Sequence, residues 1–146
     1  MRPKHLNAAR VGLTLAMSAA LASAAVAETV SYKADLKAAS EVPANSSPGT
    51  GSVVATYDTG SKKLNWTVTF SNLTGAATAA HFHGPAAAGK NAGVAVAIKG
   101  TASPLAGSAT LTDAQAADLK AGKWYVNVHT AANKDGEIRG QVLAGK

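Results

Sequence analysis

The stretch VVATYDTGSKKLNWTVTF, residues 53–70, decides the fold of this chain. In its second half apolar residues occupy every second position, as Leu64, Trp66 and Val68 do, and polar residues stand between them. That period of two is typical of a β-strand with one buried face. Residues 53–57 alternate in the same way, and the turn sequence DTGS at 58–61 separates the two runs. The stretch therefore predicts a β-hairpin.

Short strands are also predicted on both sides of this hairpin. Loops rich in Gly, Pro and Asn punctuate the chain, and between them apolar and polar residues alternate over five to nine positions. We expect these further strands at 30–38, 77–83, 94–98, 124–130 and 138–142.

One segment predicts a helix instead. Thr112, Asp113 and Gln115 form a capping-box sequence, and Gly122 stands where a helix C-cap belongs. The interval allows about two to three helical turns. Many short strands with a single helix indicate an all-β protein, either an antiparallel β-sandwich or a Greek-key barrel.

The first 27 residues are predicted to be a signal peptide. Basic residues come first, then an uncharged run at 11–26 rich in Ala and Leu, then an A-x-A site at residues 25–27. The apolar run is shorter than the roughly 20 residues that span a membrane. We expect cleavage before Glu28 and export to the periplasm or the extracellular space. The mature chain, 28–146, is then a single domain with no membrane partner.

Composition excludes several classes of function. The formal net charge of +6 includes three basic residues of the predicted signal peptide, so the mature chain carries only +3. It has no stripe of Lys and Arg among aromatic residues, and we expect no nucleic-acid partner. The chain has no cysteine, which excludes disulfides, thiolate metal sites and a Cys nucleophile. No serine-nucleophile motif or carboxylate pair stands out, so no catalytic residue is assigned and a binding function is favoured over an enzyme.

The three histidines of the mature chain are the candidate metal ligands. His81 and His83 are two positions apart on one predicted strand, so their side chains share a face about 6–7 Å apart at Cα. His129 belongs to another predicted strand, and a three-His site forms if the two strands are neighbours. Imidazole suits Cu(II), with zinc as the main competitor. The alternative is that these histidines hydrogen-bond loop backbone and bind no metal.

Three further residues are expected beside these histidines: Asn127, Glu137 and Arg139. Metal-binding imidazoles commonly donate their second N–H to a neighbouring acceptor, and Asn127, Glu137 or a backbone carbonyl could supply it. Glu137 and Arg139 are two positions apart, which places them on one strand face, and Arg139 could reach a carboxylate or carbonyls near the histidine strands. The alternative is an exposed position on a hairpin.

Several blocks of the sequence resemble the CHRD (chordin-type) domain family. The blocks occur in order along nearly the whole mature chain, at Ala39–Pro43, Gly49–Gly51, Ala79–Pro85, Tyr125–Thr130 and Gly136–Gln141. The resemblance implies an antiparallel Greek-key β-sandwich, immunoglobulin-like or superoxide-dismutase-like, with the CHRD domain at 28–146. The family occurs in extracellular antagonists of bone morphogenetic proteins and as stand-alone exported bacterial proteins.

A fainter similarity is to copper–zinc superoxide dismutase. That family also has an H-x-H strand and a later V-x-V-H strand among its copper ligands, positions that His81, His83 and His129 match. This chain lacks its zinc loop and cysteines, and has Glu137 where that family has Arg. We therefore expect an exported CHRD-domain binding protein with a three-His copper site. The alternative is a metal-free domain that recognises a protein or a cell-envelope polymer, and a dismutase-like enzyme is the least favoured.

Overall fold

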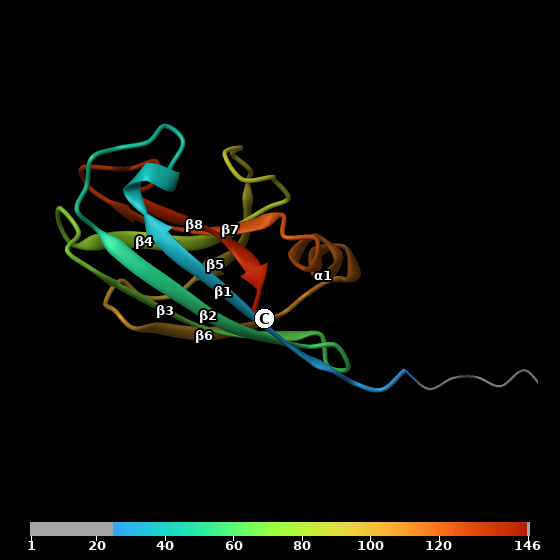
Figure 1. The fold of residues 1–146 in the computed structure, drawn as a ribbon. Helices are drawn as coiled ribbons and strands as arrows, with labels where there is room; N and C mark the ends of the chain where they lie inside the picture. Colours follow the sequence, from blue (N-terminus) through green and yellow to red (C-terminus); the bar gives the residue numbers. More distant parts are fainter. Residues whose placement is uncertain (1–24, 146) are drawn as a thin grey trace, which may run out of the picture.

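The computed structural model describes residues 25–145, and these form one curled antiparallel sheet with a single α-helix (Figure 1). The sheet order is β5-β4-β7-β8-β1-β2-β3-β6. The elements are β1 (Thr29–Lys37), η1 (Ala38–Ser40), β2 (Thr50–Asp58), β3 (Lys63–Ser71), β4 (Ala77–His83), β5 (Val94–Ile98), β6 (Leu105–Thr110), α1 (Asp113–Lys120), β7 (Trp124–Thr130) and β8 (Ile138–Ala144).

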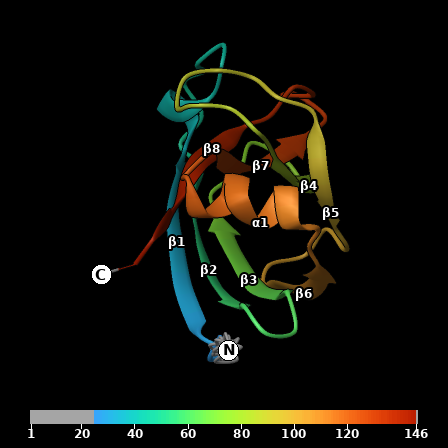
Figure 2. The same cartoon turned by 90° about the vertical axis from the view of Figure 1, so that its right-hand side faces the viewer.

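The sheet curls until it is nearly a barrel (Figure 2). Its two edge strands, β5 and β6, are consecutive in the chain and approach each other, while the β3–β4 and β6–β7 connections cross between the two halves of the sheet. Such crossings are the Greek-key feature, because neighbours in the sheet are then distant in sequence. The all-β sandwich or barrel-like fold with one helix, predicted from the sequence, is confirmed.

The predicted hairpin forms β2 and β3, which pair along their full length from Thr50↔Ser71 to Asp58↔Lys63. The expected strands at 77–83, 94–98 and 124–130 also have the observed bounds. The first strand ends one residue earlier than expected, since Ala38 begins the short turn η1.

One strand was missed. β6 has the sequence LAGSAT, in which small residues blur the alternation, and it hydrogen-bonds to β3 alone among the described strands. Its extended conformation therefore depends on pairing with β3, which a local pattern does not reveal.

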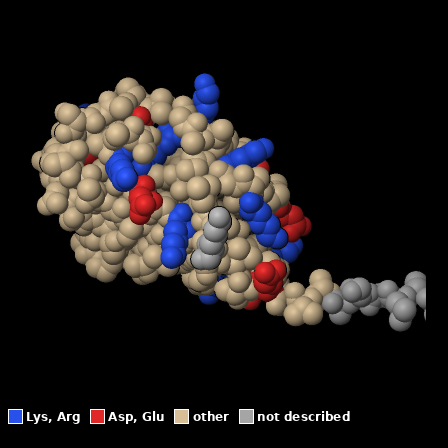
Figure 3. All heavy atoms as spheres, in the orientation of Figure 1, with Lys and Arg blue, Asp and Glu red and all other residues tan. Residues whose placement is uncertain are grey.

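Charged side chains are dispersed on the face drawn in Figure 3, where Lys and Arg atoms lie among Asp and Glu atoms and most of the surface is neither. No helix in the part of the chain from 25 to 145 is long and apolar enough to cross a membrane. The predicted signal peptide, 1–27, lies outside the described residues except for its last three.

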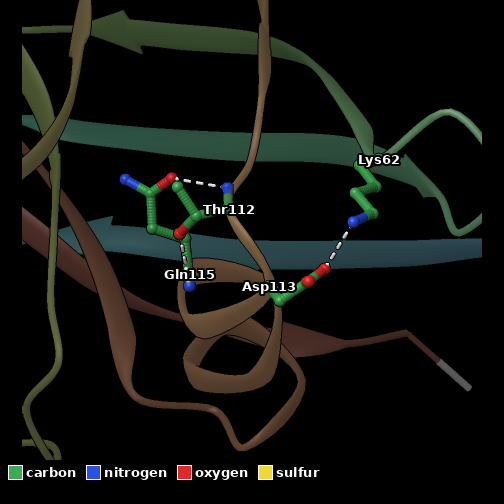
Figure 4. A network of polar contacts seen from close by, with 4 residues as sticks. All are labelled: Lys62, Thr112, Asp113 and Gln115. Atoms are coloured by element: carbon green, nitrogen blue, oxygen red, sulfur yellow. Dashed lines mark hydrogen bonds and ion pairs between the residues drawn. The ribbon is translucent and has the colours of Figure 1, made fainter.

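The helix α1 begins as the capping-box sequence predicts (Figure 4). The Thr112 hydroxyl accepts from the Gln115 backbone N–H at 3.2 Å, and the Gln115 side-chain oxygen accepts from the Thr112 N–H at 3.0 Å. Lys62 pairs with Asp113 in the first turn at 2.7 Å. Gly122 follows the helix with φ +69°, a left-handed conformation that favours glycine.

The strands β4, β7 and β8 are buried on one face and partly buried on the other. One face fills the apolar core with Phe82, Val126, Val128 and Ile138. The opposite face is polar, and the β4–β5 loop, residues 84–93, arches over it toward the segment that follows β1 (Figure 2). The Asn91 side chain holds this contact by donating to the Val42 carbonyl at 3.0 Å. The fold therefore has a second, polar and partly buried layer outside the apolar core.

Candidate metal centre

Strand register brings the three candidate histidines together on this polar face. β4 and β7 are neighbours, and their pairing places His81 opposite Asn127 and His129 opposite Ala79. The ring centroids of His81 and His129 lie 5.0 Å apart, and those of His81 and His83 5.5 Å apart. One ligand nitrogen from each of the three rings lies within 4.8 Å of the others. The condition for a three-His site, adjacency of the two strands, is met.

Two of these histidines already have the spacing of metal ligands. His81 Nδ1 lies 3.1 Å from His129 Nε2. Two nitrogens bound to one ion at about 2.0–2.1 Å, with an angle of about 100°, are separated by about 3.1–3.2 Å. The His129 Nδ1 lies 2.7 Å from the Lys134 carbonyl, which can only accept, so Nδ1 carries the proton. In the neutral ring His129 Nε2 therefore accepts a hydrogen bond that His81 Nδ1 donates.

The third histidine, His83, is fixed by its surroundings. Its Nδ1 lies 3.0 Å from the Ala92 carbonyl and its Nε2 lies 2.9 Å from Asn127 Oδ1. The Tyr125 ring stacks on the imidazole with a centroid separation of 4.8 Å and an angle of 4° between the planes. The three ligand nitrogens lie within 4.8 Å of one another, whereas nitrogens on opposite sides of one ion lie about 4.1 Å apart. A shift of roughly 1 Å in one ring would therefore bring all three to binding distance of a single ion.

Arg139 completes this stack from the other side of Tyr125. Its guanidinium carbon lies 3.5 Å from the centre of the Tyr125 ring. The same guanidinium donates to the Lys90 carbonyl and to Asn91 Oδ1 in the β4–β5 loop. Arg139 is only 2% exposed, which excludes the exposed-hairpin alternative, and it reaches a backbone carbonyl in the loop that follows the histidine strand β4, as expected from the sequence.

The expectation that Glu137 assists the histidines is wrong, and Asn127 alone of the three candidates contacts a histidine ring directly. Glu137 precedes the first residue of β8, so the period-two argument does not apply to it. Its carboxylate, fully buried, accepts hydrogen bonds from Ser47, Thr74 and Asn133 in three loops and from Thr130 at the end of β7.

These surroundings change the pKa values of His81, His83 and Glu137 for different physical reasons. Burial lowers the pKa of His81, as do the neighbouring His129 and His83 rings. Burial also lowers the pKa of His83, although the bonds to Ala92 and Asn127 oppose it. Burial alone would raise the pKa of Glu137, but the bonds from Ser47, Thr130 and Thr74 prevail and lower it to about 2. The lowered pKa values favour the neutral form of both histidines, which is the form that binds metal.

Sequence reasoning missed Glu41. This residue is 4% exposed, its pKa is raised to about 7 by burial, and its Oε1 has no hydrogen-bond partner. Its carboxylate lies beside the Asn127 side chain and Gly136. Glu41 stands in a polar loop in the sequence, and only the fold shows that the β4–β5 loop and the 133–136 turn cover it.

The family of the chain follows from its comparison with known families. The sequence model of the CHRD domain matches residues 32–142, from the interior of β1 to the interior of β8. The chain belongs to the CHRD domain family. This CHRD domain includes all three histidines and the residues that surround them. No curated protein and no solved structure matches the chain.

Proposed function

We propose that this CHRD domain binds a divalent metal ion, copper(II) in preference to zinc, through His81, His83 and His129. The observation that supports this most is the convergence of three imidazole nitrogens within 4.8 Å from two adjacent strands. Nitrogen donors favour Cu²⁺ over Zn²⁺ in the general affinity order of divalent ions, and copper(II) accepts a tetragonal set of nitrogens with weaker further ligands.

The surroundings of the rings favour a binding site over a chance cluster. The Lys134 and Ala92 carbonyls each orient one ring, which is the usual role of the groups around metal-binding histidines. The stacking of Tyr125 on His83 and of Arg139 on Tyr125 limits rotation of the third ring. Orientation before binding reduces the entropy that the site loses when the ion enters.

We propose further that the domain acts outside the cytoplasm, in the periplasm or the extracellular space. The basic segment, the apolar run and the A-x-A site at 25–27 support export with cleavage before Glu28. Intact-mass measurement of the exported protein is expected to give a chain that begins at Glu28, and a mature product that retains residues 1–27 would contradict this.

Titration of the metal-free mature protein with CuCl₂ and with ZnCl₂ tests the site. The wild type is expected to bind one copper per chain, more tightly than zinc, and the His81→Ala/His83→Ala variant to lose at least 100-fold in copper affinity. The matched control is Asn65→Ala/Thr67→Ala, which also changes two residues spaced by two on one strand, but on the exposed face of β3. Copper binding by the wild type no tighter than by the histidine variant would refute the proposal.

The competing function is a metal-free domain that binds a protein or an envelope polymer. One observation favours it: both ring nitrogens of His83 already have protein partners. A wild type that binds no copper would support this function. Tight copper binding without turnover of superoxide would identify a binding protein, whereas turnover would identify an enzyme.

A further inference from the structure

We propose that Asn127 is a fourth ligand of the metal, through its side-chain oxygen Oδ1. The inference rests on the proposed function and adds to it, because it changes the donor set from three nitrogens to three nitrogens and one oxygen. The evidence for it is the orientation of the Asn127 amide and the contact between that amide and His83.

The orientation of the Asn127 amide is fixed from its nitrogen side. Nδ2 donates to the Asp135 carbonyl at 3.3 Å, and the Glu41 carboxylate lies on the same side. Any side chain in place of Gly136 would collide with both Nδ2 and the Glu41 carboxylate, so the turn packs closely against them. Acceptors attract the nitrogen end of the amide, and Oδ1 is consequently the end that faces His83.

The His83 nitrogen that faces this oxygen is itself a hydrogen-bond acceptor. Its Nδ1 must carry a proton because the Ala92 carbonyl 3.0 Å away can only accept. In the neutral ring Nε2 then has no proton and acts as an acceptor. Nε2 and Asn127 Oδ1 lie 2.9 Å apart. His83 is 9% exposed and Asn127 3% exposed, so the two groups have little access to solvent. Two buried acceptors at this distance repel each other unless a proton or a metal ion lies between them.

The spacing suits a metal ion in that position. Two donors bound at about 2.0–2.1 Å, with an angle of about 90°, are about 2.9 Å apart. His81 Nδ1 and His129 Nε2, at 3.1 Å, have the same spacing, and His81 is the direct cross-strand neighbour of Asn127. The four donors thus form two pairs on the β4–β7 ladder. Amide oxygens also occur as copper ligands, weaker than imidazole nitrogens, and this is the role assigned to Oδ1.

A proton on His83 Nε2 would satisfy the same pair, and the experiment separates the two cases. Wild type, Asn127→Ala, Asn127→Asp and the exposed control Asn65→Ala are titrated with CuCl₂, and the copper-loaded proteins are compared by electron paramagnetic resonance. We expect Asn127→Ala to bind copper at least tenfold more weakly. Asn127→Asp is expected to bind within threefold of the wild type or more tightly, with a changed copper hyperfine splitting, and Asn65→Ala to match the wild type.

Wild-type affinity and an unchanged spectrum in Asn127→Ala would overturn the inference. So would a lower melting temperature in Asn127→Ala together with an unchanged spectrum at saturating copper, since this marks a purely structural role. If Asn127→Ala does not fold, the isosteric Asn127→Asp decides, and a wild-type spectrum there refutes direct ligation. Copper binding that requires His81 and His83 but ignores position 127 leaves the proposed function intact, whereas a wild type that binds no copper refutes both.

Discussion

At the scale of single residues, burial shifts the pKa values of side chains on the polar face of this CHRD domain. Burial lowers the pKa of both His81 and His83. We expect their rings, followed by NMR in the metal-free protein, to titrate below 6.5, the usual value for histidine. A titration midpoint at or above 6.5 for both rings would contradict the burial that the structure gives them.

Glu137 is a buried charge that accepts hydrogen bonds from several surrounding segments. Replacement by Gln removes the charge and leaves a group that cannot accept at both oxygens, so donors from Thr74 and Thr130 lose partners. We expect Glu137→Gln to lower the free energy of unfolding by about 2–4 kcal/mol, since bonds to charged acceptors contribute about 1.5–3 kcal/mol each. Urea unfolding measures this, with the exposed Glu28→Gln as the matched control. Equal stability of the two variants would show that the cluster contributes little.

At the scale of elements, Arg139 joins β8 to the β4–β5 loop that covers the histidines. Its two bonds to residues 90 and 91 and its contact with Tyr125 tie the loop to the sheet. We expect Arg139→Ala to cost about 2–4 kcal/mol, because a buried, multiply bonded cation is removed and the loop acceptors are left unpaired.

The same variant gives a local readout. Hydrogen exchange at 84–93 is expected to increase in Arg139→Ala more than exchange in the β2–β3 hairpin, because the loop loses its anchor while the hairpin keeps its ladder. The conservative Arg139→Lys is expected to retain part of the stability but not the protection of the loop, since Lys lacks the planar fork. A change in stability below about 0.5 kcal/mol for Arg139→Ala would mark it as an ordinary surface substitution.

At the scale of the whole molecule, the low pKa of Glu137 predicts how the free energy of unfolding depends on pH. Its pKa is about 2 in the folded protein against an ordinary value of 4.5, so the unfolded chain binds the proton more readily. The contribution of Glu137 is fully present above about pH 4.5 and is lost as the pH falls from there through about 2, a change of up to about 3 kcal/mol. Urea unfolding from pH 6 to pH 2.5 measures it.

The control for this dependence is Glu137→Gln. Its stability is expected to fall less than that of the wild type over the same range, because the variant has no carboxyl at this position to protonate. Parallel losses in the two proteins would assign acid sensitivity to other groups.

The sequence by itself determined the local features of this protein. The alternation around Trp66 gives the hairpin, the capping box gives the start of α1, and the spacing of His81 and His83 places both side chains on one strand face. Each of these depends on residues close together in the chain, where backbone geometry relates side-chain direction directly to spacing.

Only the tertiary structure decided which distant segments meet. The Greek-key crossings place β4 beside β7, and this brings His129 to His81 across 48 residues of chain. The same arrangement pairs β6 with β3, buries Glu41 under a loop, and directs Glu137 away from the histidines into its own cluster. A strand pattern specifies which face is buried but not which strand lies alongside, because strand partners depend on the packing of the whole sheet.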